Sequence, residues 1–200
     1  MLTQFKNLII LYAPGLGGNH LANLISTSRV FNRNFRADLY SSDSENAHYS
    51  DVSNLKKDSL IKNLVKLKTQ SNVLCGHLGE YLWIKHNIAD RFFSNKKFLI
   101  IKFPNKDTVA YQRLLKFAPH LANEYYYQEQ LTLYSKQHLV LLFNETDFVE
   151  MPAELLFAKD TVELENFLTK ELGIQLDQQL VPQLHAKWYD SVLNQIDNYK

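Results

Sequence analysis

The stretch NLIILYAPGLGGNH, residues 7–20, followed by LANLI, residues 21–25, decides the fold. An apolar run ends at a turn that contains Gly15, Gly17 and Gly18, and apolar residues then recur at helical spacing. This pattern predicts a buried strand, a tight loop and a helix. Such a loop directs backbone N–H groups and the positive end of a helix dipole at one point, so we expect it to bind a phosphate or sulfate group.

The composition is that of an ordinary globular protein, with 46% hydrophobic and 22% charged residues in a chain of 200. This length fits a single domain over residues 1–200, and the formal net charge of +1 gives no reason to expect nucleic-acid binding. The single cysteine, Cys75, excludes an intrachain disulfide, and no apolar run reaches the 18 residues of a membrane-spanning helix. We therefore expect a cytoplasmic protein with no targeting peptide and no membrane partner, and the oligomeric state stays open.

Four apolar runs are candidates for buried strands, at residues 8–12, 73–77, 98–102 and 139–143. Helical patterns separate them, and residues 32–54 are expected to form a polar surface excursion beside the site. Seven helices are expected: from the loop to about Ser28, over residues 55–68, over 80–93, from an N-cap at Asp107 to about Phe117, over 121–134, over 160–173 and over 178–197. The helix over 160–173 begins with a capping box at Asp160 and Glu163 and ends at Gly173. Its inward side chains are expected to be Val162, Phe167 and Leu168. This order predicts a three-layer α/β fold with a mainly parallel sheet of four or five strands flanked by helices.

In such a sheet, ligands bind beyond the carboxyl ends of the strands. The loops after the first three strands carry residues 15–20, His77 and residues 102–106, so we expect these groups to meet there. The anion-binding residues are expected to be Gly15, Leu16, Gly17, Gly18, Asn19 and His20. The imidazole of His20 has two interpretations: it adds a donor to the anion, or it caps the helix or packs on a neighbour.

The loop differs from the two common nucleotide-binding patterns. The loop of ATPases reads Gly-x-x-x-x-Gly-Lys-Ser/Thr, and no lysine follows Gly17 or Gly18. The dinucleotide pattern Gly-x-Gly-x-x-Gly fails because position 20 is His20. An ATPase or dehydrogenase is therefore weakly supported.

The loop resembles that of the sulfotransferases that use 3′-phosphoadenosine 5′-phosphosulfate (PAPS), which typically reads Pro-Lys-Ser-Gly-Thr-Thr-Trp-Leu. Residues 14–21, PGLGGNHL, keep its proline, glycine and leucine as Pro14, Gly17 and Leu21. Other elements that resemble this family follow in the same order: CGH at 75–77, IIKFP at 100–104, LFNETDF at 142–148 with Pro152 beyond, FLTKELGI at 167–174, and His185 with Trp188. This resemblance implies a P-loop-like fold and one sulfotransferase-like domain that uses PAPS as co-substrate.

The resemblance also implies roles for individual residues. His77 would be the general base that takes a proton from an acceptor hydroxyl, and Lys102 would bind the nucleotide and supply positive charge during transfer. The loop lysine of the family falls on Gly15, and the serine that helps to hold the 3′-phosphate falls near Ala110. Arg113, on the following helix, would replace a missing phosphate ligand. The acceptor would be a small molecule or glycan with a hydroxyl or amine group.

Structural roles are the alternative for every one of these residues. The glycines can serve a tight turn, His77 can bond a backbone carbonyl, and Lys102 and Arg113 can be ordinary surface cations. Two other functions also stay open: a non-catalytic binding or assembly protein, with the terminal helix as a partner surface, and a divergent nucleotide-dependent kinase or NTPase. No metal site is expected, because the histidines and the cysteine show no metal-ligand spacing.

Overall fold

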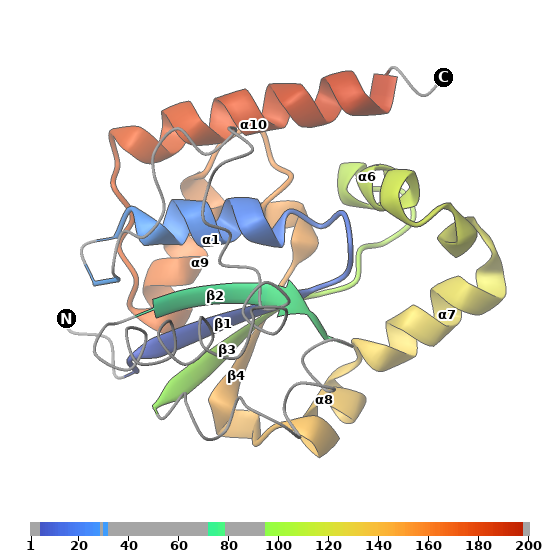
Figure 1. Ribbon diagram of the computed structural model, residues 1–200, viewed down its shortest axis with the longest axis horizontal. Helices are drawn as coiled ribbons and strands as arrows, with labels where there is room; N and C mark the ends of the chain where they lie inside the picture. The colour runs from blue at the N-terminus through green and yellow to red at the C-terminus, as the bar shows by residue number, and fades with distance from the viewer. Residues whose placement is uncertain (1–4, 29, 32–71, 79–94, 198–200) are drawn as a thin grey trace, which may run out of the picture.

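The computed structural model describes residues 5–28, 30–31, 72–78 and 95–197. These residues form a sheet of four parallel strands in the order β2-β1-β3-β4. The strands are β1 (Asn7–Tyr12), β2 (Asn72–His77), β3 (Lys96–Ile101) and β4 (Phe148–Met151). Helices flank the sheet (Figure 1), so the predicted α/β class with a mainly parallel sheet of four strands is confirmed.

Strand β1 is central, which explains its composition. It pairs with β2 on one side, where Tyr12 is level with His77, and with β3 on the other, where Leu11 is level with Ile100. All six of its residues are buried. A strand that is covered on both faces and paired on both edges must be apolar throughout, and this is why the run at residues 8–12 was a reliable signal.

The helices follow the predicted order where the structure describes them. They are α1 (Gly18–Ser26), α6 (Val109–Phe117), η2 (Pro119–Ala122), α7 (Glu124–Leu133), α8 (Lys136–Leu142), η3 (Glu145–Asp147), η4 (Ala153–Leu155), α9 (Val162–Leu172) and α10 (Leu180–Asp197). Helix α9 ends at Gly173 in the left-handed conformation, as predicted. The helices predicted over residues 55–68 and 80–93, and the excursion at 32–54, lie outside the described residues.

Helix α10 lies over α1, which in turn lies along the sheet (Figure 1). Its apolar face is used for this contact, because Val181, Leu184, Trp188 and Val192 are all buried. The apolar residues of this helix therefore serve packing within the fold. Among the described helices, none combines the length and the hydropathy that crossing a membrane requires.

The predicted fourth strand is wrong. Residues 139–143 belong largely to helix α8, whose N-cap is Ser135; the Ser135 hydroxyl accepts a hydrogen bond from the backbone N–H of His138 at 3.2 Å. A short apolar run fits a helix as well as a strand. The fourth strand is β4, which pairs only with β3 among the described strands and contains the polar Glu150. Its sequence therefore lacks the continuous apolar run of a central strand.

Three helix boundaries also differ from the prediction. The N-cap of α6 is Thr108 instead of Asp107, and the N-cap of α9 is Thr161 instead of Asp160. Val162 is 62% exposed and does not face inward, because Leu164, Leu168 and Leu172 form the buried face of α9. The helix predicted over residues 121–134 is divided into η2 and α7, with Asn123 as the N-cap of α7.

Truncating two leucines of α8 tests its helical assignment. Leu139 is fully buried, so Leu139→Ala is expected to lower the free energy of unfolding by about 2–5 kcal/mol. Leu141 is 81% exposed, so Leu141→Ala should cost less than about 0.5 kcal/mol. In a strand the two side chains would share a face. Similar losses for both variants in urea unfolding would contradict the helix.

Candidate active site

The candidate site lies where the chain changes direction across the sheet. Strand β1 is followed in the chain by β2 on one side and later by β3 on its other side. In parallel α/β sheets, ligands bind in the crevice outside the carboxyl ends of the strands at such a point. The glycine loop leaves β1 at this edge, and residues 102–108 leave β3 beside it.

The loop is a tight turn of five residues between Tyr12 and Gly18. The backbone N–H of Leu16 donates to the carbonyl of Ala13 at 3.1 Å, and the Leu16 side chain is fully buried. Gly17 precedes the helix with a φ of 71°, a left-handed conformation that favours glycine. Leu16 can therefore contribute only backbone groups to a ligand.

Each loop glycine lies directly against a ring. A Cβ atom on Gly15 would lie 2.9 Å from Phe117, one on Gly17 would lie 2.8 Å from Trp188, and one on Gly18 would lie 2.1 Å from Tyr12. These contacts explain structurally why all three positions are glycine. They also bring α6 and α10 onto the loop, from positions about 100 and 170 residues further along the chain.

The first turn of α1 can bind an anion through its backbone. No side chain caps this helix. The first N–H groups of a helix have no partner within it, and they carry the positive end of the dipole. Here these groups belong to Gly18, Asn19 and His20. The arrangement fits the predicted anion site.

Asn19 is held by the sheet through its side chain. Its Oδ1 accepts hydrogen bonds from the Tyr12 hydroxyl and the Cys75 thiol, each at 2.9 Å. The thiol is buried. In the ATPase pattern this second helical position carries the lysine. Asn19 has no charge to offer in its place, and its oxygen is already engaged.

His20 packs inside the protein, which was one of its two predicted interpretations. It is 5% exposed, and its ring stacks on Trp188 with centroids 4.2 Å apart and planes at 4°. Its Nε2 lies 3.3 Å from Nδ1 of His185, which is also buried. Burial, followed by the nearby His185, holds the pKa of His20 well below its usual value.

His77 ends β2 next to the loop. Its side chain is half-buried and meets the Tyr12 ring edge-on, with centroids 5.1 Å apart. Because side chains alternate along a strand, His77 and Cys75 project from the same face of the sheet, and this is the face that α1 covers. His77 and the first turn of α1 therefore lie on one side of the sheet.

Lys102 is not brought together with His77. It follows β3, where its backbone N–H donates to the carbonyl of Met151, and its Nζ lies 4.0 Å from Glu150 of β4. Ile100 is level with Glu150, so Lys102 projects from the face opposite to that of His77. Lys106, the next cation, is paired with Glu124.

Arg113 is the predicted cation with unused bonding capacity. Its Nε and Nη1 are buried without a hydrogen-bond partner, and burial lowers its pKa. Its guanidinium lies over the Phe117 ring at 4.3 Å, and the same ring contacts Gly15. Arg113 is thus separated from the loop by one aromatic ring.

The structure adds Tyr12 and Phe117 to the residues that shape the site. Tyr12 contacts Gly18, Asn19 and His77. Its place at the end of the first strand, directly before the glycine loop, was a signal available in the sequence. The position of Phe117 on the loop depends on how α6 crosses it, and no sequence pattern indicates that.

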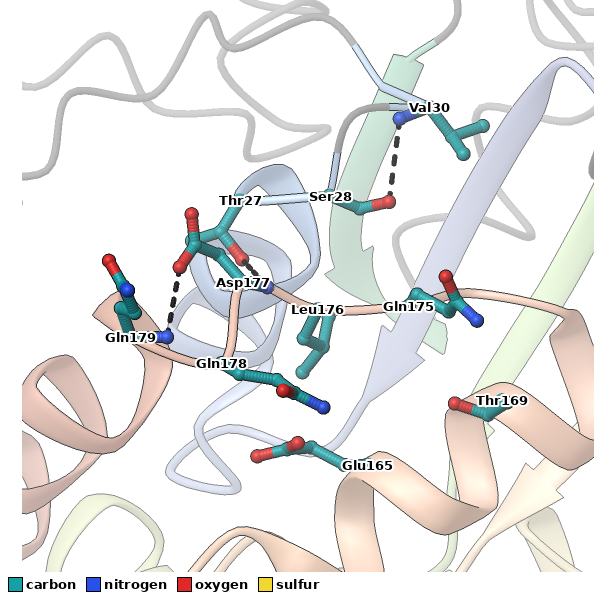
Figure 2. A pocket seen from close by; sticks show the side chains of 10 residues that line it. All are labelled: Thr27, Ser28, Val30, Glu165, Thr169, Gln175, Leu176, Asp177, Gln178 and Gln179. Atoms are coloured by element: carbon teal, nitrogen blue, oxygen red, sulfur yellow. Dashed lines mark hydrogen bonds between the residues drawn. The ribbon is translucent and has the colours of Figure 1, made fainter.

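A separate cavity of about 780 Å³ lies at the other end of α1 (Figure 2). It is lined by Thr27, Ser28, Val30, Glu165, Thr169 and the connector residues Gln175, Leu176, Asp177, Gln178 and Gln179. Asp177 caps α10 there, accepting from the backbone N–H groups of Gln179 and Leu180 at 3.0 Å. Glu165 and Asp177 are the charged residues among these, so the cavity is a poor site for a phosphate group. None of the predicted site residues lines it.

Comparison with known proteins provides no relative: no family model and no curated protein matches the chain. Within the described ranges, no three His, Cys, Asp or Glu side chains are arranged to hold a metal ion.

Replacing Gly18 tests the contact between the loop and β1. Alanine normally stabilises a helical position relative to glycine by about 0.5–1 kcal/mol. Because the added methyl group would overlap the Tyr12 ring, we expect Gly18→Ala instead to lower stability by about 1–3 kcal/mol in urea unfolding. In a Tyr12→Ala background the same change should be neutral or stabilising. An equal loss in both backgrounds would contradict the contact.

The buried His20 makes stability depend on pH. Its unfolded-state pKa is about 6.5 and its folded-state pKa is lower, so below pH 6.5 protons bind preferentially to the unfolded chain. Stability should fall as the pH drops from 6.5 toward the folded pKa, by at most about 1.4 kcal/mol per pH unit from this group. His20→Gln should reduce this slope. Equal slopes in wild type and His20→Gln would contradict the assignment.

Proposed function

We propose that this protein binds the 5′-phosphosulfate end of PAPS at the first turn of α1 and transfers its sulfonate group to an acceptor hydroxyl or amine. The observation that carries the proposal is the uncapped N-terminus of α1 at the carboxyl edge of β1, where the chain changes direction across the sheet. The ordered resemblance of the loop and the later segments to PAPS-dependent sulfotransferases supports this choice of nucleotide.

Arg113 supplies the positive charge for the nucleotide in this proposal. Its two buried, unpartnered nitrogens are costly unless a ligand occupies them. A phosphate group would accept two hydrogen bonds from one guanidinium. The family's serine falls near Ala110, one turn earlier on the same helix, so Arg113 replaces it from α6.

His77 takes the acceptor proton. The acceptor oxygen forms a bond to sulfur, the bond from sulfur to the phosphate oxygen breaks, and the adenosine bisphosphate leaves with that electron pair. The acceptor hydroxyl proton goes to the His77 imidazole, which is half-buried on the same face of the sheet as the first turn of α1.

The position of Lys102, away from His77, favours a second candidate function: a non-catalytic protein that binds the same nucleotide. Sulfonate transfer needs positive charge on the transferring group. Lys102 faces Glu150, and the family's loop lysine is replaced by Gly15. Backbone N–H groups alone suffice for binding. A kinase or NTPase is supported less, since Asn19 and His20 stand at the helical positions of the lysine and the hydroxyl residue and both side chains are engaged.

Ligand-dependent thermal unfolding tests the proposal. 3′-Phosphoadenosine 5′-phosphate at about 100 times its Kd should raise the free energy of unfolding by about 2.7 kcal/mol. Arg113→Met keeps an unbranched apolar side chain but removes the guanidinium, and it should weaken binding roughly tenfold or more, since a hydrogen bond to a charged group contributes about 1.5–3 kcal/mol. Lys170→Met, which removes an 84% exposed cation of α9, is the matched control and should leave binding unchanged.

The outcomes separate the candidates. No stabilisation by the bisphosphate or by ATP–Mg²⁺ at millimolar concentration would contradict both enzymes and the nucleotide-binding protein. Stabilisation by ATP–Mg²⁺ alone would favour the kinase or NTPase. If the bisphosphate binds, His77→Ala should abolish sulfonate transfer from PAPS and keep the binding. Binding without transfer in the wild type, over a broad set of hydroxyl and amine acceptors, would favour the non-catalytic protein.

A further inference from the structure

Trp188 of α10 contacts both the glycine loop and the first turn of α1. Its ring lies against Gly17, where a Cβ would be 2.8 Å from Cζ2, and it stacks on His20 with planes at 4°. A single indole thus holds the last residue of the loop and the third residue of the helix. Any movement of Trp188 changes the backbone that surrounds the proposed anion site.

The position of His20 is set in turn by His185. Nε2 of His185 lies 2.8 Å from the carbonyl oxygen of Ala158, which can only accept, so this nitrogen carries a proton. In the neutral ring, Nδ1 of His185 is then an acceptor, and Nε2 of His20, 3.3 Å away, donates to it. Two consecutive hydrogen bonds thus run from His20 to His185 and from His185 to the Ala158 carbonyl. They connect α1, α10 and the segment before α9.

We propose that His185 is a positioning residue for the loop: through His20 and Trp188 it holds Gly17 and the first turn of α1 in one conformation, and acid releases this hold. Its consequence for ligand affinity rests on the proposed function. The coupling between His185 and the loop does not, because it concerns contacts within this chain.

The hydrogen bonding explains why acid opens the contact. One added proton still leaves an N–H···N hydrogen bond between the two rings, whereas a second proton on the pair leaves no acceptor between them. Burial also opposes the charged form, as the lowered pKa of His20 reflects. The titratable neighbours of the pair are on α10, where the Tyr189 ring lies 6.2 Å from that of His185. From the segment before α9 the pair meets the Ala158 carbonyl, and Phe157 and Leu156 of that segment lie against Trp188 and Gly17, so none of these contacts brings a carboxylate to the pair.

The first experiment measures the loop without any ligand. In ¹⁵N-labelled protein, the Gly17 and Gly18 amide shifts should follow the titration of His20 below pH 6.5. His185→Gln keeps an acceptor for His20 and a donor for Ala158 but removes the second imidazole. It should preserve the amide shifts at pH 7.5 and move the titration step to higher pH, because His185 lowers the pKa of His20. His185→Leu should displace the Gly17 amide at every pH, whereas His120→Gln, an exposed residue, should change nothing.

Loop amides that do not follow His20, or a step that stays in place in His185→Gln, would overturn the inference. A second experiment measures the affinity for 3′-phosphoadenosine 5′-phosphate at pH 7.5 and 5.5. Because the phosphates of the ligand also titrate, wild type and His185→Gln are compared at each pH. The wild type should lose more affinity than the variant on acidification; equal losses contradict the release of the loop by acid. Coupled amide shifts without ligand binding refute the proposed function alone.

Discussion

The close packing of the glycine loop against three aromatic rings is the constraint on which this structure depends. Tyr12, Phe117 and Trp188 come from the first strand, α6 and α10, and each lies where a Cβ atom would be on a loop glycine. The loop can be this compact only because it has no side chains at those positions. The same contacts bring the carboxyl edge of the sheet, α6 and α10 together, so they assemble the candidate site and the core at once.

This packing also explains which side chains remain for ligand chemistry. Asn19 and His20 occupy the helical positions where nucleotide-binding loops place their reactive groups, yet both are used to join elements. What remains at the first turn of α1 is the backbone. Arg113 is the cation nearest to it on α6, and the burial of its two unpartnered nitrogens is unfavourable. The site is thus poor in charged side chains and rich in fixed dipoles.

The parts of the fold that the sequence could predict are those set by local pattern. Strand β1 is buried on every side, so its apolar run identifies it, and Gly173 marks a helix end because it adopts φ of 66°. The strand predicted over residues 139–143 was wrong because a short apolar run with a buried Leu139 fits a helix as well as a strand. The loop was predictable from its glycines, but the rings that cover it come from distant segments. Lys102 was misplaced relative to His77 because its face depends on the register between β3 and β1.

The charges and dipoles around the loop favour the binding of an anion more than they favour catalysis. Backbone dipoles and a guanidinium at the phosphate end of a nucleotide stabilise the ground state and the transition state to a similar degree, and only a difference between the two accelerates a reaction. In sulfonate transfer that difference arises from charge aimed at the transferring oxygens. To provide this charge, Lys102 would need to leave Glu150 and reach around the end of β3. Its ion pair with Glu150 is long, at 4.0 Å, and its side chain is 52% exposed, so little free energy opposes this movement. In the proposed sulfonate transfer, catalysis therefore requires Lys102 to move to the face of His77 when the nucleotide binds.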